Sequence, residues 1–87
     1  MRYTVIIEKG ETGYGAYAPD IPGCGTVAET REAVEQLIRE AIEFHLGGLV
    51  LAGQPIPQPV SDAITVDVAL PVSPASQPAL ATRSDTA

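Results

Sequence analysis

The chain has 87 residues and a formal net charge of −6, so it suits one small domain and lacks the clustered lysines and arginines of a nucleic-acid surface. A domain of this size buries only about 60% of the surface that its unfolded chain exposes, so self-association is expected. The single cysteine excludes a disulfide framework and favours a reducing compartment.

The first element predicted is a β-hairpin. Residues 2–8, RYTVIIE, are rich in β-branched side chains and indicate a strand, with Tyr3, Val5 and Ile7 on one face. Residues 9–13 form a glycine-bounded turn, and residues 14–18, YGAYA, give the return strand. The start is not a secretory signal, and no apolar run approaches the ~20 residues of a membrane helix, so we expect a cytoplasmic protein without membrane contact.

The next stretch, APDIPGCGT at residues 18–26, is expected to bend the chain sharply and to turn Ile21 inward. Proline fixes φ, and glycine adopts backbone conformations that other residues avoid. Residues 24–28 are expected to form a short third strand. A reactive Cys24 would need a base or positive charge nearby. The one histidine, His45, falls near the end of the following helix, where a packed or partly exposed side chain without a catalytic role is expected. We therefore predict that Cys24 is a buried or half-buried thiol.

Residues 30–46 carry the spacing of an amphipathic helix. Its apolar stripe comprises Val34, Leu37, Ile38, Ala41, Ile42, His45 or Leu46, and Leu49. Thr30 is the natural N-cap, and Glu35 and Arg39 form an i, i+4 pair in the favourable order. Gly47 and Gly48 are candidates for the helix stop, although the helix can continue to about Ala52.

The prolines at residues 54–59 impose an extended path after the helix. Residues 63–70, AITVDVAL, alternate strictly and indicate a half-buried strand. Residues 71–87 are rich in Pro, Ser and Ala and are expected to be a disordered tail. The sequence thus predicts an α+β domain over residues 1–70 in the order β-β-β-α-β. One helix covers one sheet face, and a second subunit is expected over the other.

Several residues at fixed spacing along this order of elements resemble the pattern of the HicB-like antitoxin family. The shared pattern is Tyr-x-Ala in a strand, Pro-Asp-Ile-Pro-Gly-Cys, a Thr-x-Glu-Ala helix start, Ala-Ile and a Pro-rich segment. The matching positions are Tyr14, Ala16, Pro19, Asp20, Ile21, Pro22, Gly23, Cys24, Thr30, Glu32, Ala33, Ala41, Ile42, Pro55 and Pro57. The resemblance covers most of residues 1–70. Ala28 departs from it, since the family usually has glycine before the acidic-Thr pair.

The resemblance implies a partial ribonuclease-H-like fold and an antitoxin that binds a small basic HicA-type ribonuclease toxin. Many members add a C-terminal DNA-binding module, but residues 71–87 hold one arginine and no helical stripe, so no direct DNA binding is expected from this chain. No catalytic, metal-binding or cofactor-binding residue is assigned. The candidate site residues are motif residues with a structural role, which are also candidates for partner contact: Tyr14, Pro19, Asp20, Ile21, Pro22, Gly23, Cys24 and Thr30.

Two other function classes stay open. One is an orphan HicB-like interaction module, a dimer or tetramer with another protein partner. The other is a ribonuclease-H-like nuclease, which needs several carboxylates converging on two metal ions. The candidates Glu8, Asp20, Glu29 and Asp67 are spread over a strand end, a turn, a helix start and the last predicted strand. The sequence therefore favours a binding protein without catalysis.

Overall fold

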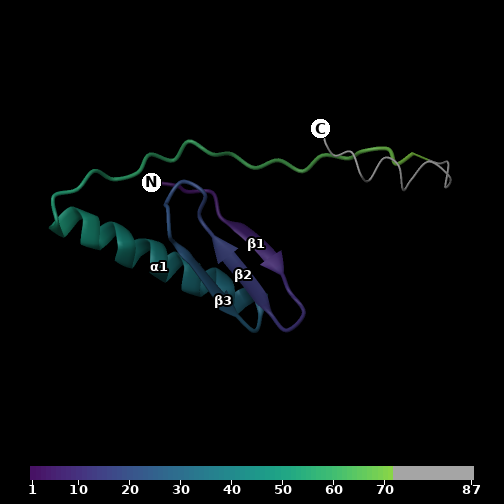
Figure 1. The fold of residues 1–87 in the computed structure, drawn as a ribbon, viewed down its shortest axis with the longest axis horizontal. Helices are drawn as coiled ribbons and strands as arrows, with labels where there is room; N and C mark the ends of the chain where they lie inside the picture. The colour runs from purple at the N-terminus through teal and green to yellow at the C-terminus, as the bar shows by residue number, and fades with distance from the viewer. Residues whose placement is uncertain (72–87) are drawn as a thin grey trace.

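Three antiparallel strands and one helix form the body of the protein (Figure 1). The structure is a computed structural model that describes residues 1–71. Strands β1 (Ile6–Lys9), β2 (Tyr14–Tyr17) and β3 (Gly25–Ala28) pair in the order β1-β2-β3. Helix α1 (Arg31–Leu51) lies across one face of this sheet. The predicted α+β class and its β-β-β-α order are confirmed.

The first strand is shorter than the sequence predicts. Ile6 pairs with Tyr17, and β2 ends there because the chain bends. Residues 2–5 therefore run past the end of their partner strand. At the other end of the hairpin, a Cβ on Gly13 would lie 2.5 Å from the carbonyl oxygen of Ala28, so the close approach of β3 requires glycine at this position.

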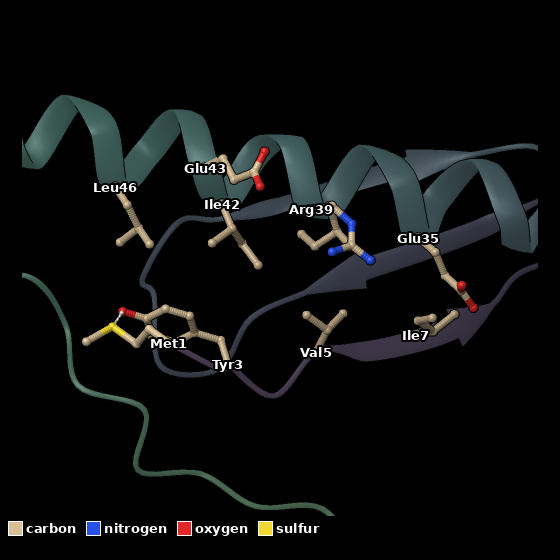
Figure 2. A pocket seen from close by; sticks show the side chains of 10 residues that line it. Met1, Tyr3, Val5, Ile7, Glu35, Arg39, Ile42, Glu43 and Leu46 are labelled. Carbon is tan, nitrogen blue, oxygen red and sulfur yellow. Dashed lines mark hydrogen bonds between the residues drawn. The ribbon is translucent and has the colours of Figure 1, made fainter.

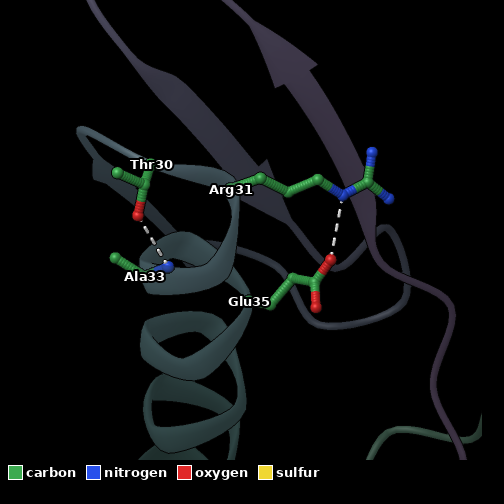
Figure 3. A network of polar contacts seen from close by, with 4 residues as sticks. All are labelled: Thr30, Arg31, Ala33 and Glu35. Atoms are coloured by element: carbon green, nitrogen blue, oxygen red, sulfur yellow. Dashed lines mark hydrogen bonds and ion pairs between the residues drawn. The ribbon is translucent and has the colours of Figure 1, made fainter.

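Helix α1 begins as predicted and ends later than its first candidate stop. The Thr30 hydroxyl accepts a hydrogen bond from the Ala33 N–H at 3.1 Å, which confirms the N-cap (Figure 3). The helix continues through Gly47 and Gly48 to Leu51. Gly53 follows with φ +69°, the left-handed conformation that glycine adopts readily after a helix.

The ion pair on α1 differs from the predicted one. Arg31 Nε donates to Glu35 Oε2 at 2.9 Å (Figure 3), and the predicted pair of Glu35 with Arg39 is not the one formed. Both partners are exposed, so the pair stabilises the first helical turns only weakly.

The core is small and lies between α1 and the sheet. It comprises Ala16, Ala18, Ile21, Cys24, Val34 and Ile38. Leu37 is 40% exposed, so the helix buries a narrower stripe than its spacing predicts. The face away from α1 carries Ile6, Tyr17 and Val27, and Val27 is 77% exposed. The prediction that one helix covers only one sheet face is confirmed.

The predicted fourth strand is wrong for the single chain. After α1 the chain is extended, passes the start of β1 and projects away from the body (Figure 1). Residues 63–70 are all exposed and form no strand. Alternation selects which side chains share a face, but a strand also needs a neighbour for its backbone groups. Of the predicted tail, residues 71–87, only Pro71 lies inside the described range.

Candidate functional site

The bend at residues 18–24 is held by its own backbone. The Ala18 N–H donates to the Cys24 carbonyl at 3.2 Å, and the N–H groups of Ile21 and Cys24 donate to the carbonyls of Ala18 and Ile21, each at 3.1 Å. Gly23 has φ +77°, which disfavours any other residue type. This geometry drives Ile21 inward until it is 1% exposed, as predicted.

Asp20, at the tip of this bend, binds a segment 40 residues further along the chain. Its Oδ2 accepts hydrogen bonds from the N–H groups of Val60 at 3.0 Å and Ser61 at 2.8 Å, and its Oδ1 accepts one from the Ser61 hydroxyl at 2.7 Å. These bonds, the one from the Ser61 hydroxyl above all, lower the pKa of Asp20 below its ordinary 3.8. Asp20 therefore has a structural role, since it joins the bend to residues 60 and 61. We call this arrangement the Asp20 clamp.

Two hydroxyl groups near the start of β1 reinforce the Asp20 clamp. The Tyr3 hydroxyl donates to the Pro57 carbonyl at 2.6 Å, and the Thr4 hydroxyl donates to the Ser61 carbonyl at 2.8 Å. Together with Asp20 they fix residues 57–61 along the N-terminal segment.

The other motif residues divide into buried and exposed ones. Cys24 is 7% exposed, and burial raises the pKa of its thiol, which disfavours the reactive thiolate. The prediction of a buried thiol is confirmed. Tyr14 packs against the core, and the Lys9 ammonium lies 5.1 Å from its ring centre. Pro19 and Pro22 are exposed, as is Gly23, so their predicted partner contact stays a prediction.

The four candidate carboxylates of the nuclease hypothesis lie in three separate places. Glu8 and Glu29 border a hollow at the hairpin turn. Asp20 is engaged in the clamp, and Asp67 lies on the projecting segment. Within residues 1–71, no three His, Cys, Asp or Glu side chains gather so that they can hold a metal ion.

The outer face of α1 carries a feature that the sequence reasoning missed. Leu37, Phe44 and Leu51 recur at intervals of seven residues and are 40, 86 and 91% exposed. Glu40 lies on the same side of the helix as Phe44, one turn before it. The seven-residue spacing is visible in the sequence, but the apolar stripe predicted for this helix includes Leu37. We call Leu37, Glu40, Phe44 and Leu51 the outer helix face.

A second surface is the β1–α1 groove, of about 390 Å³ (Figure 2). Its apolar lining comprises Met1, Tyr3, Val5, Ile7, Ile38, Ile42 and Leu46. Glu35, Arg39 and Glu43 stand along its helical rim. In Figure 2 Met1, Tyr3, Val5 and Ile7 form a row that faces the row from α1 across the opening.

Comparison with known proteins gives one family. A sequence model described as a HicB_like antitoxin of bacterial toxin-antitoxin system matches residues 3–69. A UPF0150 protein of Thermoplasma acidophilum is 39% identical over 67 residues, which cover 76% of this chain and 97% of that protein. A UPF0150 protein of Synechocystis is 40% identical over 57 residues, which cover 64% of this chain and 72% of that protein.

A third relative is a longer protein, of which the matched region covers less than half. An uncharacterized 14.9 kDa protein of Haemophilus phage HP1 is 34% identical over 58 residues, which cover 67% of this chain and 44% of that protein. No solved structure gives a significant match. Across the described residues, no helix has the length and apolar character needed to cross a membrane.

Proposed function

The chain belongs to the HicB-like antitoxin family of bacterial toxin-antitoxin systems, and from this premise we propose that it binds and neutralises a small basic ribonuclease toxin of the HicA type. The family match over residues 3–69 is the observation that carries the proposal. We propose that it acts in the cytoplasm, by binding alone and without a cofactor. Metal-dependent cleavage of an RNA–DNA hybrid by the purified chain, lost in Asp67→Asn, would contradict a purely binding role.

The outer helix face is the surface that we propose for the toxin. This face includes Glu40, and α1 as a whole carries four glutamates against two arginines, one of which is already paired with Glu35. An acidic surface complements a basic partner and steers its approach. Phe44 adds an exposed aromatic side chain, the type that dominates binding energy at protein interfaces.

We further propose that the antitoxin acts as a homo-oligomer. Within the described part of the chain, no helix lies over the sheet face with Ile6, Tyr17 and Val27. A small domain with an open apolar face gains stability when a second subunit covers that face.

The toxin proposal is tested with the protein encoded next to this chain. The two are co-expressed, this chain is used for pull-down, and growth is followed with the neighbour expressed alone or together with it. A small basic neighbour that binds, and that stops growth only when this chain is absent, supports the antitoxin. A neighbour that neither binds nor affects growth contradicts it and favours the orphan interaction module.

The docking face is tested by truncating one exposed side chain at a time. Phe44→Ala is expected to weaken toxin binding at least about tenfold, since an aromatic anchor contributes strongly at an interface. The matched control is Val60→Ala, which removes an exposed apolar side chain from the segment after α1 instead. Equal affinities for the two variants would place the toxin elsewhere on the antitoxin.

A further inference from the structure

The projecting segment, residues 64–70, exposes a row of aliphatic side chains. Ile64, Val66, Val68 and Leu70 are 82, 62, 72 and 79% exposed. None of the hydrogen bonds among the described residues joins this segment to the sheet or to α1. Its alternation and β-branched side chains favour a strand, and a strand needs a neighbour. The family match extends to residue 69, so most of the segment belongs to the shared domain.

The same chain carries an edge that also lacks a neighbour. In the described sheet β1 pairs with β2 alone, so its other edge is free. Beside this edge lies the β1–α1 groove, whose volume of about 390 Å³ holds on the order of ten water molecules. Water makes few hydrogen bonds against the apolar lining, so aliphatic side chains displace it favourably.

The Asp20 clamp directs the segment away from the groove of its own subunit. Pro57 lies beside Tyr3, which lines the groove, but at Ser61 the chain has reached Asp20 in the bend after β2. From Ser61 to Ile64 the chain spans at most about 10 Å. The segment then runs outward from the body (Figure 1). Its own groove is reached only by turning back over the start of β1.

We propose that two copies of this chain exchange their projecting segments. Residues 64–70 of each copy pair with the free edge of β1 in the other and insert Val66 and its neighbours on the same side of the alternation into the β1–α1 groove. Such strand addition satisfies backbone groups on both partners. The exchange is reciprocal, so it closes as a two-fold dimer. Asp67 points to the opposite side of the strand from Val66 and stays in water.

The exchange deepens the self-association proposed above and does not depend on a toxin. Its first test is the mass of the purified full chain, measured by light scattering over a range of concentrations. A dimer is expected. Val66→Asp is expected to raise the dimer dissociation constant at least ~100-fold, because it places a charge in an apolar groove. Thr65→Asp, the matched control on the opposite side of the strand, is expected to change it less than ~3-fold.

Both variants are expected to keep the helical circular dichroism signal of the unchanged chain, because residues 65 and 66 are exposed in the single subunit and lie outside α1. A monomer at every concentration contradicts both the exchange and the self-association. Equal weakening by Val66→Asp and Thr65→Asp contradicts the assignment of the Val66 side to the groove.

Cross-linking separates exchange between subunits from pairing within one. A chain with Val66→Cys is mixed with a tagged chain carrying Arg39→Cys at the groove rim, and a short bismaleimide is added. A covalent pair of one chain of each kind is expected. Glu40→Cys, exposed on the same helix but outside the groove, replaces Arg39→Cys in the control and is expected to give none. The unchanged chain shows the background from buried Cys24.

A chain that carries both Val66→Cys and Arg39→Cys tests the pairing within one subunit. Cross-links that form only within single chains contradict the exchange and mean that the segment binds the groove of its own subunit. A dimer without any link between the two cysteines also overturns it, while leaving the self-association intact. Either result leaves the toxin proposal standing, because no toxin takes part in the measurement.

Discussion

At the scale of single residues, Asp20 joins parts of the chain that no local pattern connects. Its carboxylate accepts three hydrogen bonds from Val60 and Ser61, which lie 40 and 41 residues later. Because all three donors favour the ionised form, the clamp is strongest when Asp20 is charged. Asp20 therefore stabilises the path of the chain after α1, and this stabilisation depends on pH because it requires the ionised carboxylate.

Asp20 is expected to make folding stability depend on acid. Its pKa is lowered below 3.8 in the folded protein, so between the folded and unfolded values the unfolded chain binds more protons. The stabilisation is therefore present above pH 3.8 and is lost as the pH falls through the folded value. The expected result is an unfolding midpoint for the unchanged chain that exceeds that of Asp20→Asn at neutral pH and approaches it in acid, measured in urea.

The control for this prediction is Asp62→Asn, one residue beyond the clamp. Asp62 is exposed, and among residues 1–71 the one hydrogen bond that its carboxylate accepts comes from the N–H of its neighbour Ala63. The unfolding midpoint of Asp62→Asn in urea is expected to stay close to that of the unchanged chain at every pH. An Asp20→Asn curve parallel to that of the unchanged chain down to low pH would show that the clamp does not form in solution.

At the scale of elements, α1 tolerates two glycines because the caps at its ends and the packing of its inner face stabilise the helix. The helix has 21 residues, with Thr30 as N-cap and Gly53 behind its C-terminus. Gly47 and Gly48 lie inside it, where each costs about 1 kcal/mol relative to alanine. A Cβ added at either position would meet nothing within 4 Å.

Substitution of alanine for glycine is therefore expected to act in opposite directions in α1 and in the bend. Gly47→Ala is expected to raise the free energy of unfolding by about 0.5–1 kcal/mol through helix propensity. Gly23→Ala is expected to lower it by about 1–2 kcal/mol, because residue 23 has φ +77°. Neither added methyl meets a neighbour within 4 Å, so the backbone conformation decides both signs. Urea unfolding of the two variants measures them, and a destabilising Gly47→Ala would mean that α1 ends before residue 47.

The elements also show how far the sequence predicts this structure. The N-cap at Thr30, the bend with its inward Ile21 and the α1 stripe follow from neighbours a few residues apart, and all were predictable. The conformation of residues 63–70 was not predictable, because an alternating pattern does not specify which strand, if any, lies beside the segment. The clamp between Asp20 and Ser61 spans 41 residues, and no local spacing encodes it. The sequence does not single out Phe44, because Leu37, seven residues before it, falls in the predicted apolar stripe.

At the scale of the whole molecule, charge and surface shape act together. The net charge of −6 gives a field that attracts a basic partner from a distance. That field does not choose a docking face, since the acidic residues lie on the hairpin turn as well as on α1. The face is set by short-range contacts, for which the outer helix face offers Phe44 and its neighbours.

The association of this chain with the proposed basic toxin is therefore expected to depend both on salt and on the charge of the outer helix face. Raising the salt concentration from about 0.05 to 0.5 M is expected to lower the association rate constant at least ~10-fold, because it screens the field of the whole antitoxin. Glu40→Gln removes one negative charge from the outer helix face and is expected to lower the rate further at low salt. Stopped-flow mixing with the purified toxin measures both effects.

Glu11→Gln distinguishes the local face from the total charge. It removes the same charge from the hairpin turn, at the border of a hollow away from the outer helix face. Because the field falls off within about 10 Å at 0.1 M salt, a charge close to the docked partner affects the rate more than a distant one. Glu40→Gln is therefore expected to slow association more than Glu11→Gln. Equal slowing by the two variants would mean that only net charge matters and would remove the support for α1 as the docking face.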